Sequence, residues 1–283
     1  MAATDMQSEN RWHVIANEKA SKVILGVDFP AEGRREASFK DLMGKMGPAW
    51  SGYKLIQTVP PSARLDERLS CDTYIQHWTP DGQWDPGDVA AVMGYCIGSV
   101  YAAPVAETVR RLGGSAVKVI LFDPQPMETK LLATEMYKNI TLAGSTLSDE
   151  EAASARKETD EIVAAHLNDL PKGAMAIMDL FRRISSLACG RIGLNDARRE
   201  EINQIFESYM AWLSAAAQIN PGAVWKDSVA IMSTDYQTLA AEKNTAIIST
   251  MEIIDQKFQV DVAHADLMRA EPTAALLLRH SGL

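Results

Sequence analysis

The chain has 283 residues, of which 47% are hydrophobic and 23% charged, and its formal net charge is −9. Such a composition is ordinary for a globular protein with a buried core, organised as one large domain or two small ones. The negative charge argues against general nucleic-acid binding, which needs a basic surface. No stretch approaches the ~20 apolar residues of a membrane span, and residues 1–11 lack the apolar core of a secretory signal. Three cysteines do not predict a disulfide framework, so a cytoplasmic protein without membrane contact is expected.

Up to residue 125 the sequence alternates between strand and helix patterns. Short apolar, β-branched runs predict strands at 22–29, 53–59, 89–93 and 116–122. Helical spacing between them, bounded by Pro and Gly, predicts helices at 38–46, 66–78 and 99–112. This alternation is typical of a parallel sheet with crossover helices.

The alternation then stops, and residues 127–219 have the pattern of several amphipathic helices, with starts at Ser148 and Asn195. Strand character returns at 227–232 and 257–262, before a final helix at 272–280. A sheet interrupted by a helical insertion is therefore predicted, with a core at 1–126 and 223–283 and a lid at 127–222. A separate helical domain is the alternative. The insertion's methionines form either core or an adaptable pocket; they are Met127, Met136, Met175, Met178 and Met210.

The segment 94–98, Gly-Tyr-Cys-Ile-Gly, lies between a predicted strand and a predicted helix. A nucleophile elbow holds its central residue in a strained turn, so the positions two before and two after it must be small. Gly94 and Gly98 meet this requirement around Cys96. The helix N-terminus that follows favours a thiolate. Cys96 is therefore a candidate nucleophile, and a buried structural cysteine on a tight turn is the alternative.

An elbow nucleophile is followed along the chain by its acid and then by its histidine. Asp123 ends the next strand, so its carboxylate is expected at the same sheet edge as Cys96. His264 follows the last predicted strand and is the candidate base. Asp235, which follows the strand at 227–232, is the alternative acid.

Five segments together carry a family resemblance. They are the strand end and loop at 29–33, the elbow, the strand end at 121–124, the long helical insertion and the segment 264–268, His-Ala-Asp-Leu-Met. On these the chain resembles, over nearly its whole length, the α/β-hydrolase-fold thioesterases of nonribosomal peptide and polyketide synthesis. It departs from them in two places. Glu32, Arg34 and Arg35 stand where the family usually has a glycine-rich stretch, and Cys96 stands where it usually has serine.

The resemblance implies an α/β fold, that of the α/β hydrolases, with a mostly parallel sheet and a large helical lid that covers the elbow. It also implies a triad of Cys96, His264 and an acid. The position of the acid in peptide-synthetase thioesterases supports Asp123, and that in stand-alone editing thioesterases supports Asp235. The resemblance further implies an oxyanion hole formed by the backbone N–H groups of Ile97 and Ala31.

A cysteine nucleophile changes the expected chemistry. Acylation of Cys96 by a pantetheine thioester exchanges one thioester for another, so the acyl group stays activated for transfer. The resemblance therefore implies an acyltransferase that moves an acyl or aminoacyl group between carrier proteins. The substrate would be presented on phosphopantetheine, with no bound cofactor or metal. A hydrolytic editing or product-releasing thioesterase and a non-catalytic hydrolase-fold binding protein are the alternatives.

Overall fold

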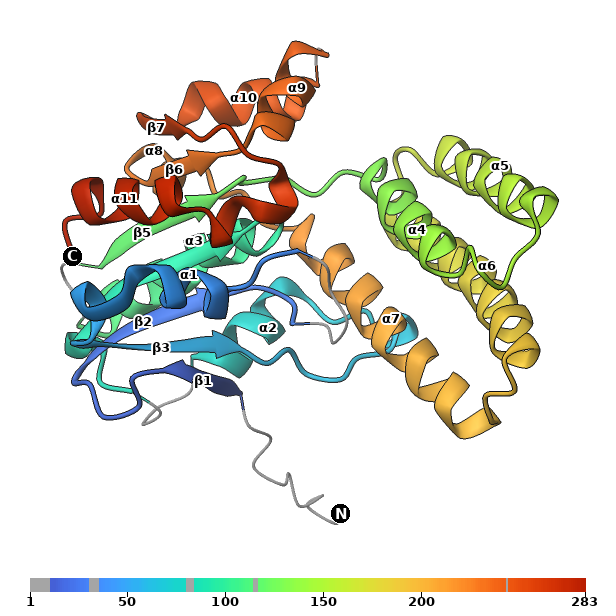
Figure 1. The fold of residues 1–283 in the computed structure, drawn as a ribbon, viewed down its shortest axis with the longest axis horizontal. Coiled ribbons are helices and arrows are strands. Elements are labelled where there is room, and N and C mark those ends of the chain that lie inside the picture. The colour runs from blue at the N-terminus through green and yellow to red at the C-terminus, as the bar shows by residue number, and fades with distance from the viewer. Residues whose placement is uncertain (1–10, 31–35, 80–83, 114–116, 243) are drawn as a thin grey trace. The chain divides into compact units, whose positions relative to one another are not determined.

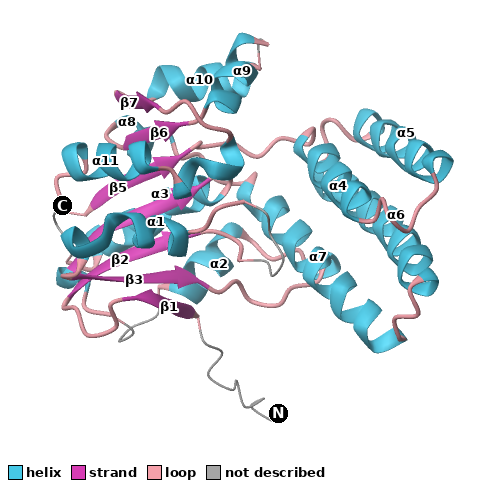
Figure 2. Ribbon diagram, in the orientation of Figure 1, coloured by secondary structure: helices cyan, strands magenta, loops and turns pink. Residues whose placement is uncertain are grey.

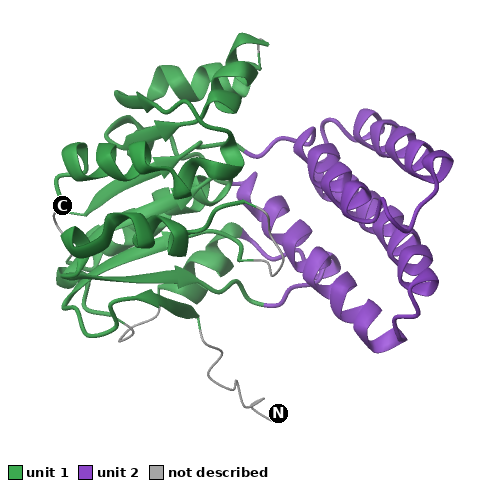
Figure 3. Ribbon diagram, in the orientation of Figure 1, with its two compact units in different colours: residues 1–61, 71–126, 219–283 green, residues 62–70, 127–218 purple. Residues whose placement is uncertain are grey.

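The computed structural model describes residues 11–30, 36–79, 84–113, 117–242 and 244–283. The chain divides into two compact units, coloured separately in Figure 3. Unit 1 comprises residues 1–61, 71–126 and 219–283, and unit 2 comprises residues 62–70 and 127–218. The chain therefore leaves unit 1 twice, once briefly at 62–70 and once for the long helical segment after Pro126. The sequence predicted the long helical segment but not the short one at 62–70. It also placed the end of the long segment at residue 222, whereas unit 2 ends at residue 218.

Within the described residues, unit 1 is built on a seven-stranded sheet of order β1-β3-β2-β4-β5-β6-β7 (Figures 1 and 2). All neighbouring pairs are parallel except β1 and β3, which are antiparallel. The strands are β1 (Trp12–Ala16), β2 (Lys22–Val27), β3 (Tyr53–Thr58), β4 (Val89–Tyr95), β5 (Lys118–Phe122), β6 (Val229–Met232) and β7 (Gln256–Gln259). A mostly parallel sheet was predicted and is confirmed.

Helices cover both faces of the sheet, as Figure 1 shows, with α1 and α11 in front of the strands and α3 behind them. Successive side chains of a strand point to opposite faces. In β4, Met93 and Tyr95 belong to the core cluster that also contains side chains of α1 and α11. Gly94, between them, lies against α3. The elbow strand is thus buried on both faces, which explains its apolar sequence.

The helices of unit 1 follow the predicted crossovers, with additions near its end. The predicted ones are α1 (Phe39–Met46), α2 (Cys71–Trp78), α3 (Gly98–Arg111) and α11 (Glu271–His280). Absent from the prediction are α8 (Gly222–Lys226), α9 (Thr234–Ala241), α10 (Thr245–Ile253) and the 3₁₀ helix η4 (His264–Arg269). Two further 3₁₀ turns are η1 (Gly47–Trp50) and η3 (Pro86–Asp88).

Unit 2 consists of four helices and one short 3₁₀ turn among the described residues. They are α4 (Leu131–Leu142), α5 (Asp149–Ala165), α6 (Leu170–Arg191), α7 (Asp196–Ala216) and η2 (Leu65–Glu67). The predicted starts at Ser148 and Asn195 are confirmed as N-caps. Ser148 Oγ accepts from the Glu151 N–H at 3.2 Å, and Asn195 Oδ1 accepts from the Arg198 N–H at 2.9 Å.

The predicted helix at 66–78 is wrong in its first part. Arg68 adopts a left-handed conformation, with φ of 50°, which ends η2, and α2 begins only at Cys71. The η2 segment packs within unit 2, where the Ala63 N–H donates to Ser208 Oγ at 3.1 Å and the Leu65 N–H donates to Glu207 Oε1 at 3.2 Å.

The methionines of unit 2 are mostly core. Met136, Met178 and Met210 are fully buried, whereas Met175 is 43% exposed. None of the helices within the described ranges combines the length and the apolar composition needed to cross a bilayer.

Candidate active site

Cys96 occupies a tight turn between β4 and α3 with φ of 51°, a value that non-glycine residues rarely adopt. The glycines around it are sterically required. A Cβ at Gly94 would lie 2.4 Å from the Ser99 Cα, and one at Gly98 would lie 2.1 Å from the Val27 carbonyl oxygen. Both obstacles are backbone atoms, so neither position tolerates a side chain without a shift of the main chain. This is the geometry of a nucleophile elbow.

The main chain fixes the elbow to the neighbouring strand. The Cys96 N–H donates to the Phe122 carbonyl at 2.9 Å, and the Cys96 carbonyl accepts from the N–H groups of Ser99 and Gln125. The Cys96 thiol is free and partly buried, and Sγ donates to the Gln125 Oε1 at 3.5 Å.

Asp123 directly follows β5, at the carboxyl end of the strand next to the elbow strand. It is buried and also has a positive φ, of 44°. Its Oδ1 accepts from the Ser233 N–H at 2.7 Å, and its Oδ2 lies 2.7 Å from His264 Nδ1. Because the buried carboxylate accepts, Nδ1 carries the proton and donates.

His264 is the first residue of η4, and its ring connects the acid to the thiol. Since Nδ1 faces Asp123, Nε2 is the ring nitrogen left to interact with the Cys96 side chain, which acts on the pKa of the ring. Burial alone would lower the pKa of His264. The hydrogen bonds to Asp123 and Cys96, together with the negative charges there, instead raise this pKa to about 10.

Asp235, the alternative acid, lies in the first turn of α9 and is exposed. Its Oδ2 accepts from the backbone N–H of His264 at 2.7 Å. The two carboxylates therefore contact different parts of the same residue: Asp123 contacts the ring and Asp235 the main chain.

Of the two candidate oxyanion-hole residues, Ile97 and Ala31, only Ile97 lies within the described residues. Ile97 is the N-cap residue of α3, and no described residue accepts a hydrogen bond from its backbone N–H. Ala31 lies outside the described residues, as do Glu32, Arg34 and Arg35.

Several contacts at the site involve residues that the sequence did not single out. Gln125 lies beside Sγ, and the Ser233 N–H holds the Asp123 carboxylate. The Tyr95 ring stacks on the imidazole of His264, with 4.8 Å between centroids. The Tyr236 hydroxyl donates to the Pro124 carbonyl at 2.7 Å, and burial raises the pKa of this phenol. Only proximity in sequence to Cys96 or Asp123 could have suggested Tyr95 and Gln125.

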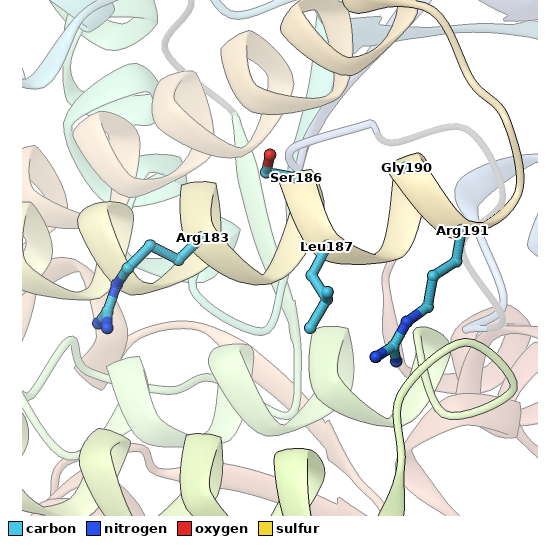
Figure 4. Close-up of a pocket in the computed structure, with 5 residues that line it drawn as sticks. All are labelled: Arg183, Ser186, Leu187, Gly190 and Arg191. Carbon is cyan, nitrogen blue, oxygen red and sulfur yellow. The ribbon is translucent and has the colours of Figure 1, made fainter.

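A hollow of about 560 Å³ lies on unit 2 along α6 (Figure 4). Arg183 and Arg191 flank Leu187 there. Arg183 pairs with Glu158, and Arg191 pairs with Glu151 at 2.7 Å. The hydrogen bond from Arg191 lowers the pKa of Glu151 to about 2. The arginine charges are thus already compensated.

In the ranges that the structure describes, no group of three or more His, Cys, Asp or Glu side chains is arranged to hold a metal ion. The functional groups gathered at the elbow are therefore a thiol, an imidazole and carboxylates, which suit nucleophilic and acid–base chemistry.

Comparison with solved structures supports the fold. The chain is similar to a structure of the Vlm2 thioesterase domain with genetically encoded 2,3-diaminopropionic acid, bound with a dodecadepsipeptide. The TM-score is 0.53 at 17% identity, and the match covers 96% of this chain and 98% of that chain. A second such structure, in space group H3, has a TM-score of 0.51 at 16% identity and covers 93% of this chain and 98% of that chain. No protein-family model and no curated protein matches the sequence.

At this identity the similarity establishes the architecture alone. The chain has the α/β-hydrolase fold, with a seven-stranded, mostly parallel sheet and a helical insertion between β5 and β6. The predicted fold class is confirmed.

Proposed function

We propose that this chain is an acyltransferase of the thioesterase type, which takes an acyl or aminoacyl group from a carrier-protein pantetheine thioester onto Cys96 and passes it to an acceptor thiol. The observation that carries the proposal is the alignment of Asp123 with His264, whose Nδ1 lies 2.7 Å from Oδ2 of the acid, beside a Cys96 side chain that raises the pKa of the ring. A nucleophile bonded to a base, which is in turn oriented by a third group, is the general arrangement for covalent catalysis.

In the first half-reaction, the proton of the Cys96 thiol has already passed to His264 Nε2, and the Sγ thiolate attacks the carbonyl carbon of the substrate thioester. The bond from that carbon to the pantetheine sulfur breaks, and the proton passes from His264 to the leaving thiolate. The products are an acyl-Cys96 thioester and a free pantetheine thiol. Asp123 keeps Nδ1 protonated and stabilises the imidazolium that forms, and the Ile97 N–H is the proposed donor to the developing oxyanion.

The second half-reaction runs the same steps on an acceptor. An acceptor thiol gives its proton to His264 and attacks the acyl carbon, the bond to Sγ breaks, and Sγ leaves as the thiolate beside the protonated His264. Because both esters are thioesters, neither direction is strongly favoured. A serine nucleophile would hold the acyl group as a more stable oxoester, so the cysteine favours transfer over retention.

The similarity to the Vlm2 domain agrees with the proposal, since that domain has the same fold and is named a thioesterase domain bound with a dodecadepsipeptide. A phosphopantetheine-bearing carrier protein is the proposed partner.

Intact-protein mass spectrometry with a panel of acyl and aminoacyl carrier thioesters tests the proposal. We expect a mass adduct that persists in water, discharges onto an added empty carrier and is lost in Cys96→Ala. Cys71→Ser, which removes the other partly exposed thiol, should form the same adduct.

Two other outcomes would contradict the transferase. An adduct that turns into free acid at the same rate with or without the second carrier would indicate an editing thioesterase. No adduct with any thioester, although the carriers bind, would indicate a non-catalytic binding protein.

A further inference from the structure

Both backbone polar groups of His264 are held by side chains. The N–H donates to Asp235 Oδ2 at 2.7 Å, and the carbonyl accepts from the Tyr95 hydroxyl at 2.9 Å. The Tyr95 ring also lies parallel to the imidazole, with 8° between the planes. With the bond from Nδ1 to Asp123, His264 is therefore fixed at its main chain, at one ring face and at one ring nitrogen.

These contacts come from the turn after β6 and from the elbow itself. In the turn, the Ser233 N–H holds Asp123, and two residues later Asp235 holds His264. Thr234, between them, donates its N–H to the Val262 carbonyl at 2.9 Å and its hydroxyl to Asp261 Oδ1 at 3.1 Å. Residues 233–235, at the start of α9, therefore contact both Asp123 and the segment that carries His264.

A main-chain anchor matters here because His264 lies after the end of β7, at the start of a short 3₁₀ helix. The hydrogen bond to the ring fixes Nδ1, and the next residue is held by the bond from the Ala37 N–H to the Ala265 carbonyl at 2.7 Å, but neither bond involves the backbone groups of His264 itself. A shift of those groups would move Nε2 relative to Sγ. The bond from the N–H to a carboxylate is charge-assisted, which makes it stronger than a neutral one.

We propose that Asp235 and Tyr95 are positioning residues that set the place of His264 Nε2 relative to Cys96 by anchoring its main chain. In this proposal Asp235 holds the backbone of His264, and Asp123 remains the triad acid. The inference rests on the proposed function for its catalytic meaning, while the anchoring itself can be measured without any substrate.

Asp235→Ala and Asp235→Asn form the test pair, since the asparagine retains an oxygen that accepts from the His264 N–H. Asp235 is exposed, so neither change leaves a cavity. Asp266→Ala is the matched control, because it removes another exposed carboxylate of the same segment, whose partner is Arg269. Tyr95→Phe is the second variant, which removes only the hydroxyl donor.

Two readouts need no substrate: the rate of Cys96 alkylation by iodoacetamide, and the low-field NMR resonance of the proton between His264 and Asp123. We expect Asp235→Ala to slow alkylation about tenfold to a hundredfold and to broaden the resonance, because small misplacements of reacting groups have effects of this order. Asp235→Asn should recover most of the rate and the resonance. Tyr95→Phe should show a smaller loss than Asp235→Ala, and Asp266→Ala should behave as the wild type.

Alkylation and resonance unchanged in both Asp235→Ala and Tyr95→Phe would overturn the inference. So would equal losses in Asp235→Asn and Asp235→Ala, because the charge rather than the acceptor would then matter. Failure of the proposed function appears separately, as a wild-type chain whose Cys96 alkylates readily but forms no acyl adduct.

Discussion

Cys96 and Cys71 are both partly exposed thiols, but their neighbours differ. The Cys96 side chain interacts with the His264 ring and helps to raise its pKa, whereas burial and the Asp72 carboxylate raise the pKa of the Cys71 thiol. Cys189 is buried. Since the thiolate is the reactive form, we expect a limiting amount of iodoacetamide at neutral pH to modify Cys96 first. Peptide mapping checks this, with Cys71→Ser as the control, and faster modification of Cys71 would contradict it.

A second prediction concerns the pKa of His264. Hydrogen bonding and negative charge at Cys96 help to raise the pKa of His264 to about 10, so Cys96→Ala should lower that pKa. Asp123→Asn should lower it as well, because it removes the charge of the carboxylate that is hydrogen-bonded to Nδ1. An NMR titration of the imidazole in the wild type and the two variants measures this. A pKa that stays near 10 in Cys96→Ala would show that the thiol does not act on the ring.

Single residues also show what the sequence could predict. Cys96, Asp123 and His264 were predicted because each follows the end of a strand, at 89–93, 116–122 and 257–262. The structure brings them together because parallel strands end at one edge of the sheet. The contact of Asp235 could not be foreseen, since a position near the histidine does not say whether a carboxylate faces its ring or its backbone. The stacking of Tyr95 likewise depends on how η4 folds back over β4.

The elbow is an element whose geometry depends on two missing side chains. A Cβ at position 98 would overlap the Val27 carbonyl oxygen, so we expect Gly98→Ala to lower the free energy of unfolding by about 1–3 kcal/mol, the usual cost of overpacking. Gly44→Ala, in α1, is the control, because its new methyl group meets nothing within 4 Å beyond the adjacent residues and the backbone of its own helix.

Urea denaturation followed by circular dichroism compares the two variants. Gly44→Ala should stabilise the chain by up to about 1 kcal/mol, since glycine is unfavourable within a helix. Equal midpoints for Gly98→Ala and the wild type would mean that the main chain moves aside without cost, and the steric account of the elbow would fail.

At the scale of elements, buried strands were the easiest to predict because they are continuous apolar runs. The edge strand β1 was missed: four of its five residues are not buried, so it lacks such a run. The helices α9 and α10 were also missed. Their starts carry recognisable N-caps, Ser233 and Asn244. Both helices lie between two strand patterns, and only the strands were predicted there.

For the whole molecule, the interruption after Pro126 was visible in the sequence because the strand alternation stops there. The assignment of residues 62–70 to unit 2 was not visible. It depends on contacts such as that between Ala63 and Ser208, which are 145 residues apart in the chain. Local patterns contain no information on such pairings, so the division into units required the structure.

The stability of the whole chain should depend on pH through His264, whose ordinary pKa of 6.5 is raised to about 10 in the folded state. Below pH 6.5 the unfolded histidine is protonated too, and the stabilising interaction of the imidazolium is fully present. Between the two values only the folded state keeps the proton, so this contribution falls with rising pH, by at most about 1.4 kcal/mol per pH unit. Above pH 10 it is lost.

His264→Gln removes this titration and is the reference. The free energy of unfolding, from urea curves at intervals between pH 6 and pH 10.5, should therefore favour the wild type most at pH 6, and the difference should shrink towards pH 10. A difference that is constant, or that grows with pH, would mean that the imidazole is neutral in the folded chain. Asp123 would then orient a neutral ring, and the Cys96 thiol would have to be deprotonated during the attack on the acyl group instead of before it.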